Sequence, residues 1–457
     1  MIHFYIDLQG HSFEQRIKYV FDFIAHHPLS QNKVSFYFNA PNQTPSISYG
    51  QDQTGTYHIP RQHLIFNIKP IHPNQLVANQ YQSNDLTLYS TEREKRAKDQ
   101  PFINDNIFNF DIIETIFFHI SRYEEHIIRP DMKENWGLGF KENHFIPRNH
   151  LQEIPIVDHL VFAFLEAIGI QPEKQKTTYR LTHDVDIPLK LPNFYKLIKA
   201  SGRLLLIEHK GLKAQWNLFR TYLKMMNGRA KDPYDTFDWL FRKEAMEKVV
   251  YFMAGGVTKY DNFYKIDSGI GRRVIRQAQE KGYKIGLHPS YQAYKREDLY
   301  KREKQALEKV LGEKVILARQ HYLRFQFPET ADIIDNQGIT EDSTLGYRDM
   351  IGFRCGTGFG YKLYSFKEER AYEFVETPLI IMEWSLIEQE NQDMGKIKKH
   401  LETFLEKNQF YTKVTFLFHN SIFDMVGDKQ DTLKEIYLSL INKVLSRHLN
   451  KHQSSGQ

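Results

Sequence analysis

The sequence has one cysteine, Cys355, in 457 residues. A single thiol excludes an intramolecular disulfide framework and a cysteine-rich zinc site. A lone thiol can serve as a nucleophile, but the Phe-Arg-Cys-Gly-Thr context of Cys355 favours a packed or loop residue. Cysteine chemistry is therefore not the first expectation for this chain.

The sequence also lacks an apolar run long enough to span a bilayer. Its start, Met1 to Asp7, does not have the basic-then-apolar pattern of a signal peptide, so we expect a cytoplasmic protein. The net charge is only +5, from 61 basic and 56 acidic residues. This excess is too small at this length to indicate nucleic-acid binding.

The length exceeds what one compact core usually organises, so we expect two domains or one barrel with an appendage. Residues 1–170 mix predicted strands at 35–38 and 63–68 with two predicted helices. One helix starts after the N-cap Asp111 and carries Glu114 and Glu125 on its polar side, and the other covers 157–168. We predict a smaller α/β N-terminal domain here, with a linker-like stretch at 137–155.

From about residue 178 short apolar runs alternate with amphipathic helical segments, which is typical of repeated βα units and a parallel sheet. The sequence predicts strands at 179–185, 249–254, 284–288, 315–321, 339–343, 379–384 and 413–420. It predicts helices at 272–281, 296–311, 330–336, 395–407 and 432–448. An array of about seven strands favours a (β/α) barrel, with an open doubly wound sheet as the alternative. The second predicted domain covers residues 175–450.

Polar residues gather where these predicted strands stop. The first strand ends in Thr182-His183-Asp184-Val185-Asp186. Later strands end in His288, Arg319, His321, Asp342, Ser343, Glu383, Trp384, His419 and Asn420. Because ligand sites in parallel βα folds lie at the carboxyl ends of the strands, the sequence predicts an active site at this end.

An aspartate with two imidazoles is a suitable ligand set for zinc or a similar divalent ion, and it leaves one position open for water. A second carboxylate outside that set could take a proton from the water, and a histidine on another strand could protonate a leaving amine. The Asp-x-Asp spacing at Asp184 and Asp186 suits this division of roles at the end of a strand.

Four motifs resemble those of the polysaccharide deacetylase superfamily, carbohydrate esterase family 4. They are Leu181 to Asp186, Gly286 to Ser290, Arg319 to Tyr322 and Phe416 to Asn420. The resemblance covers roughly residues 175–450 and implies a distorted seven-stranded (β/α) barrel. The longer run Arg-Gln-His-Tyr-Leu-Arg-Phe, together with residues 342–347 and 352–354, is similar to a bacterial branch that carries an extra amino-terminal domain.

By position, the resemblance implies Asp184 as general base and His419 as general acid. It implies Asp186 and His288 as metal ligands, with a divalent ion, zinc being the expected one, as cofactor. Arg319 would orient or tune the base. The implied substrate is an N-acetylated sugar or glycan.

The second motif departs from the superfamily pattern. The superfamily has two histidines four residues apart, whereas Gln292 stands four residues after His288. We expect His321 to supply the third ligand from the neighbouring strand, with His183 as the alternative. Glu383 stands where the superfamily often has an aspartate paired with the arginine, although a strand-end charge facing solvent is an equal interpretation. The loop around Arg354 could line the substrate cleft.

A basic insertion at about 190–235 leaves directly from the Asp-x-Asp strand. Between residues 190 and 231 its one acidic residue is Glu208. Its basic residues are Lys190, Lys196, Lys199, Arg203, Lys210, Lys213, Arg220, Lys224, Arg229 and Lys231, interleaved with large apolar ones. The segment could lie on an anionic membrane or on a lipid-linked substrate, grip an anionic glycan, or form cover helices with a solvated basic face.

These features predict a metal-dependent hydrolase that removes an N-acetyl group from a sugar, glycan or lipid-linked glycan precursor. The alternative is a catalytically degenerate glycan-binding or assembly protein, for which Gln292 is the main support. A weaker alternative is a hydrolase acting on another non-peptide carbon–nitrogen bond. No nucleic-acid partner is expected.

Overall fold

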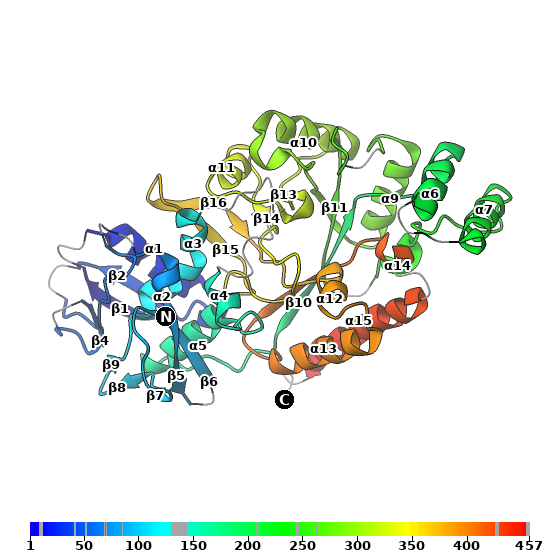
Figure 1. Cartoon of the computed structure of the whole chain (residues 1–457). Helices are drawn as coiled ribbons and strands as arrows, with labels where there is room; N and C mark the ends of the chain where they lie inside the picture. The colour runs from blue at the N-terminus through cyan, green and yellow to red at the C-terminus, as the bar shows by residue number, and fades with distance from the viewer. Residues whose placement is uncertain are drawn as a thin grey trace.

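The computed structural model describes residues 1–8, 12–40, 43–50, 53–67, 69, 71–84, 86–128, 144–206, 209, 211–243, 246–261, 264–425 and 429–453. Over these residues the protein is α/β in class, with three sheets flanked by helices (Figure 1). None of the helices in these ranges is both long enough and apolar enough to cross a membrane.

The N-terminal region contains two of the sheets. The six-stranded sheet has the order β2-β1-β3-β4-β9-β8, and the three-stranded sheet has the order β6-β5-β7. Their strands are β1 (Ile2–Asp7), β2 (Val34–Phe38), β3 (Ile47–Tyr49), β4 (Tyr57–Ile59), β5 (Val77–Ser83), β6 (Leu86–Glu92), β7 (Gln100–Pro101), β8 (Ile103–Asn104) and β9 (Ile107–Phe108). The helices are α1 (Glu14–His26), α2 (Ile112–Ile120), α3 (Tyr123–Ile127), α4 (Phe145–Arg148) and α5 (Ile156–Ala167).

Of the strands and helices predicted for this region, some are confirmed and one strand is wrong. The strand at 35–38 and the helix at 157–168 are confirmed as β2 and α5, and Asp111 caps α2 by accepting from the Glu114 N–H at 2.9 Å. The strand predicted at 63–68 is wrong over its described residues. There the N–H groups of Leu64, Ile65 and Phe66 donate to the buried Glu114 carboxylate, so they are not available to a strand ladder. Residues 68 and 137–143 of the predicted strand and linker lie outside the described ranges.

The third sheet contains all seven strands predicted for the second region. In sheet order they are β14 (Glu341–Asp342), β13 (Leu317–Ala318), β12 (Lys284–Leu287), β11 (Glu247–Phe252), β10 (Thr178–Val185), β18 (Lys413–Leu417) and β17 (Ile381–Met382), all parallel to their neighbours. Two further strands, β15 (Tyr361–Ser365) and β16 (Arg370–Glu376), form an antiparallel hairpin beside β14. The sheet therefore has nine described strands rather than seven.

One connecting segment, residues 377–380, forms hydrogen bonds both beside β14 and with β18, which lie towards opposite ends of the sheet order. Thr377 donates to the Asp342 carbonyl at 2.8 Å and Leu379 to the Leu345 carbonyl at 3.2 Å, both beside β14. Ile380 then donates to the Thr415 carbonyl of β18 at 3.2 Å. Among the described strands no ladder joins the outer strands β15 and β17, so the predicted closed barrel is not a feature of the strand pairing itself.

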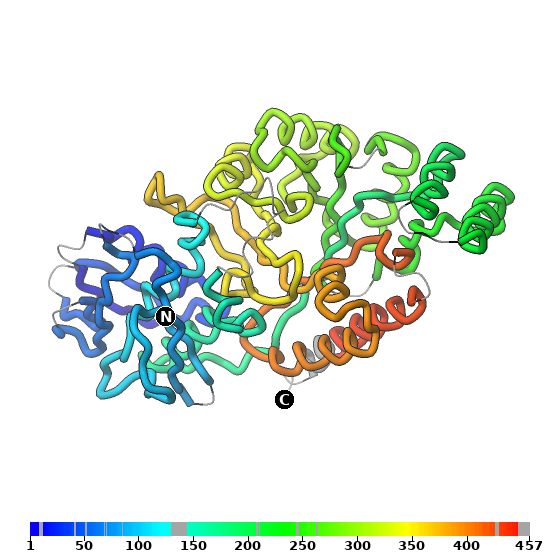
Figure 2. The backbone as a smooth tube through the Cα atoms, in the orientation of Figure 1, coloured from blue at the N-terminus to red at the C-terminus, as the bar shows by residue number. Residues whose placement is uncertain are grey.

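Helices predicted between the strands are confirmed as α9 (Gly269–Glu280), α10 (Glu297–Leu311), α11 (Glu329–Asn336), α13 (Met394–Lys407) and α15 (Gln430–Gln453). Short helices occur at α8 (Phe237–Leu240), α12 (Glu383–Gln389) and α14 (Ile422–Met425). Two more, α6 (Phe194–Leu206) and α7 (Leu212–Met226), make up the basic insertion. They project at the end of the molecule opposite the N-terminal strands (Figures 1 and 2).

A buried charge cluster connects the N-terminal region to the nine-stranded sheet. Glu125 Oε1 accepts from Arg122 at 2.6 Å and from Arg354 at 2.9 Å, and all three side chains are at most 4% exposed. Burial alone would raise the pKa of Glu125, but the two guanidinium charges outweigh it and lower the pKa to about 2. Arg354, which stands in the loop that the sequence suggested could line the cleft, has its side chain in this cluster.

We expect Glu125→Ala to reduce the free energy of unfolding by about 3–5 kcal/mol, because it leaves two buried guanidinium groups without their carboxylate. Urea denaturation followed by circular dichroism measures the change. Glu373→Ala is the matched control, since the Glu373 side chain is 78% exposed in its pair with Lys362. A loss as small for Glu125→Ala as for the control would contradict the role of the cluster.

Candidate active site

Strand β10 divides its polar residues between its two faces. Side chains two residues apart share a face of a strand, so Thr182 and Asp184 point to one side and His183 to the other. His183 donates from Nδ1 to the Phe418 carbonyl at 2.7 Å and packs against Tyr283. His183 therefore lies on the helix-covered side of the sheet, which removes the alternative third ligand.

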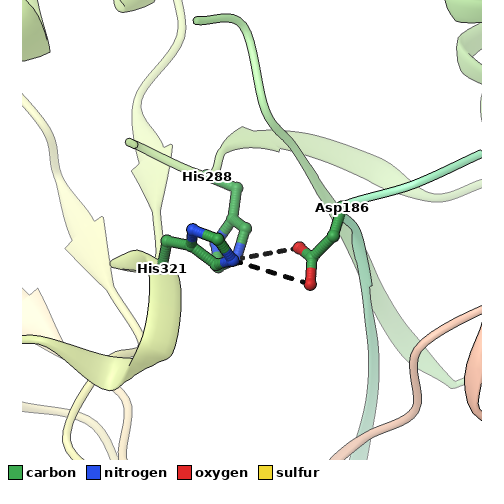
Figure 3. A group of neighbouring side chains, drawn as sticks. All are labelled: Asp186, His288 and His321. Carbon is green, nitrogen blue, oxygen red and sulfur yellow. Dashed lines mark ion pairs between the residues drawn. The ribbon is translucent and has the colours of Figure 1, made fainter. Parts of the chain in front are cut away.

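Asp186, His288 and His321 converge at the carboxyl ends of β10, β12 and β13 (Figure 3). Each offers one ligand atom, and the three atoms lie within 4.8 Å of one another. His288 Nε2 is 3.3 Å from Asp186 Oδ1, and His321 Nε2 is 3.7 Å from Asp186 Oδ2. Ligands at about 2.0–2.2 Å from a tetrahedral zinc ion lie roughly 3.3–3.6 Å apart, so the two separations from Asp186 are at or close to that range.

The hydrogen bonding of His288 and Asp186 is what a cation site requires. His288 Nδ1 donates to the Arg319 carbonyl at 2.6 Å, so in the neutral ring Nε2 carries a lone pair that faces the carboxylate. Asp186 Oδ1 is buried and has no hydrogen-bond partner among the described residues. Two electron-rich atoms 3.3 Å apart repel each other unless a cation or a proton lies between them.

Asp261 supports His321 from behind, and sequence reasoning missed it. Its Oδ1 lies 3.7 Å from His321 Nδ1, and its carboxylate accepts from the backbone N–H groups of Thr258 and Tyr291 at 2.8 and 2.7 Å. Burial alone would raise the pKa of Asp261, but these interactions lower it to about 2. A carboxylate behind an imidazole orients the ring and makes it a better ligand. Asp261 stands in a loop outside the recognised motifs, so no sequence signal marked it.

Arg319 fixes Asp184. Its side chain is fully buried and donates to Asp184 Oδ1 at 3.0 Å and to Thr182 Oγ1 at 2.7 Å. It also donates to the carbonyl and the hydroxyl of Ser343, each at 2.8 Å. The second oxygen of the carboxylate, Asp184 Oδ2, lies 3.7 Å from His288 Nε2. One carboxylate oxygen is thus anchored, and the other faces the candidate ligand set.

His419 is held by Glu383. Its Nδ1 lies 2.5 Å from Glu383 Oε1, and its Nε2 lies 3.7 Å from Asp186 Oδ2. Burial alone would lower the pKa of His419, but the charge and hydrogen bond of Glu383 raise it to about 10. Glu383 is 2% exposed and pairs with the histidine, so both interpretations drawn from the sequence, an arginine partner and a solvent-facing charge, were wrong.

A cleft of about 400 Å³ opens over these residues. Its floor includes Asp184, Asp186, His288, His321, Glu383 and His419. Its walls include the apolar and aromatic residues Tyr322, Leu323, Met382, Trp384, Leu417, Ile422 and Met425, and two arginines, Arg203 of α6 and Arg348. Gln292 is exposed and Cys355 is buried, and neither lines the cleft.

Comparison with known proteins gives a distant likeness. Residues 6–171 match the Family of unknown function (DUF7033). No curated protein matches the sequence. Among solved structures, the polysaccharide deacetylase Bc1974 from Bacillus cereus is 9% identical with a TM-score of 0.27, covering 61% of this chain and 89% of that one.

Two further structures match to a similar extent. A probable polysaccharide deacetylase from Pseudomonas aeruginosa is 9% identical with a TM-score of 0.35, covering 62% of this chain and 89% of that one. The chitin deacetylase from Colletotrichum lindemuthianum is 12% identical with a TM-score of 0.27, covering 59% and 86%. Similarity at this level does not establish the fold or the activity of this chain.

We expect His321→Ala to weaken zinc binding by at least about 100-fold, because it removes one of the three candidate ligands. Gln292→Ala, at the position where a histidine ligand would be usual, should bind zinc like the unaltered protein, because Gln292 lies outside the cleft. Isothermal titration calorimetry of the metal-stripped proteins measures both affinities. Weaker binding in Gln292→Ala together with unchanged binding in His321→Ala would contradict the assigned ligand set.

Proposed function

We propose that this chain is a metal-dependent hydrolase that removes an N-acetyl group from a sugar, glycan or lipid-linked glycan precursor. One observation carries the proposal. A three-ligand set, an anchored carboxylate and an anchored imidazole meet in one cleft, at distances of 3.0 to 3.7 Å between neighbouring groups. Hydrolysis of an amide needs such groups to activate water and to protonate the leaving amine.

Asp186, His288 and His321 would hold the ion, and zinc suits a set of two imidazoles and one carboxylate. When bound, a divalent ion there supplies Lewis-acid polarisation of the acetyl carbonyl and acidifies a nearby water. We also propose that the chain divides into two domains, at 1–170 and 175–450. The same proposal includes the closure of the nine-stranded sheet into a barrel.

Asp184 would accept the proton of the attacking water. Arg319 fixes one of its oxygens at 3.0 Å, so the other oxygen is left for the reaction. His419 would then donate a proton to the leaving nitrogen from Nε2, because Nδ1 is committed to Glu383. With a pKa raised to about 10 by Glu383, His419 carries the required proton at neutral pH.

A catalytically degenerate glycan-binding protein is the second candidate. The observation in its favour is the exposed Gln292, which stands where the resemblance would place a ligand histidine. The apolar and aromatic walls of the cleft would serve glycan binding without turnover just as well. Release of acetate separates the two candidates, and release of ammonia instead would indicate a hydrolase of another carbon–nitrogen bond.

We expect the zinc-loaded protein to release acetate from a panel of N-acetylated sugars and glycans, measured by a coupled acetate assay. Asp184→Asn should lower kcat by roughly 100- to 10,000-fold while the protein still binds zinc, because it removes the base and keeps the ligands. Asp186→Ala should lose both acetate release and zinc binding. Asp267→Asn, an exposed aspartate outside the cleft, is the control. Glycan binding with no acetate from the unaltered protein would favour the second candidate.

We expect Glu383→Gln to shift the basic limb of the kcat–pH profile to lower pH by at least about one unit. Glu383 raises the pKa of His419, so its neutral replacement lets His419 lose its proton at lower pH. Glu388→Gln, an exposed residue of the same helix, should leave the profile unchanged. A profile that falls in height without shifting would show that Glu383 acts only on the fold.

A further inference from the structure

The α6–α7 hairpin has an inner face and an outer face. Leu191, Leu197 and Leu218 form a small core of their own, and Leu204 and Tyr222 pack against it. This core is separate from the main core of the molecule. The hairpin is therefore held together from within, and it projects from the body of the protein (Figures 1 and 2).

The outer face of α7 is a continuous apolar stripe. It consists of Leu212, Trp216, Phe219, Leu223 and Met226, which are 84%, 62%, 40%, 43% and 69% exposed. Their spacing of three or four residues places all five along one side of the helix. Single large apolar residues are common on a protein surface, but five along one side of a helix are not. We therefore expect this stripe to bind another molecule or a membrane.

The outer face of α6 repeats the pattern. Phe194, Tyr195, Ile198 and Leu206 are between 57% and 78% exposed, and Leu205 is 48% exposed. Neither helix contains an acidic residue. Basic residues run beside the apolar ones on both helices, namely Lys196, Lys199, Arg203, Lys213, Arg220 and Lys224.

This charge pattern selects among the possible occupants. Two copies packed by this face would bring rows of like charge together, which is unfavourable. A soluble anionic glycan would satisfy the cations but would leave Leu212, Leu223 and Met226 in contact with water or sugar hydroxyls. A membrane with anionic lipids satisfies both requirements, because acyl chains accept the apolar stripe and headgroups accept the cations.

We propose that the outer face of the α6–α7 hairpin docks on the surface of an anionic lipid bilayer. The helices lie in the interface and do not cross it. Arg203 belongs to α6 and also lines the cleft, so docking brings the cleft to the level of the headgroups. A substrate attached to the membrane could then enter without leaving it. The docking itself requires no hydrolysis and does not depend on the proposed function.

The test uses the full-length protein and sedimentable vesicles. We expect binding to phosphatidylcholine vesicles containing about one-third phosphatidylglycerol, and weak or no binding to phosphatidylcholine alone. Trp216→Ser should weaken binding by about tenfold or more. Arg220→Gln and Lys224→Gln should each weaken it by roughly fivefold, the equivalent of one surface cation. Val257→Ser is the matched control, since Val257 is 83% exposed on a loop outside the hairpin.

Each contrary result overturns the proposal. One is the absence of binding to the anionic vesicles, and another is binding that Trp216→Ser and the charge variants leave unchanged. A third is concentration-dependent self-association, measured by sedimentation velocity, that Trp216→Ser abolishes, because the occupant would then be a second copy. Binding of a soluble anionic polysaccharide, without vesicle binding, would assign the face to glycan. Acetate release is measured separately, so failure of docking and failure of the proposed chemistry are distinguishable.

Discussion

The buried guanidinium of Arg319 is the constraint on which the arrangement of the cleft depends. It donates to Thr182 and Asp184 at the end of β10 and to Ser343 after β14, while its own carbonyl accepts from His288 after β12. A buried cation must be compensated fully, so these strand ends cannot shift independently. Asp184 and His288 are held in place by the same residue.

The other groups of the cleft follow the same principle. His321 is backed by Asp261 and His419 by Glu383, and in each case the partner comes from a different strand or loop. A side chain whose rear atom is committed presents one defined atom to the cleft. For His419 the rear ring nitrogen is hydrogen-bonded to Glu383 at 2.5 Å, whereas His321 Nδ1 lies 3.7 Å from the Asp261 carboxylate and is attracted by its charge.

Much of the fold and of the candidate site could be predicted from the sequence, because the patterns that indicate them are local. Apolar runs located all seven strands, and the polar residues at their ends located Asp184, Asp186, His288, His321 and His419. The β15–β16 hairpin was missed because its side chains alternate at the edge of the sheet without a long apolar run. Asp261 and the Glu383–His419 pair could not be predicted, since they depend on which distant segments become neighbours in space.

The cluster of Arg122, Glu125 and Arg354 bears on how such a protein can change in evolution. Arg354 also donates to the carbonyl of Gly346, two residues before Arg348 in the wall of the cleft. A segment some 230 residues earlier in the chain therefore helps to place that wall. Exchange of the N-terminal region for an unrelated one would break this support. A replacement region would have to supply an equivalent buried carboxylate to Arg354 to keep that wall in place.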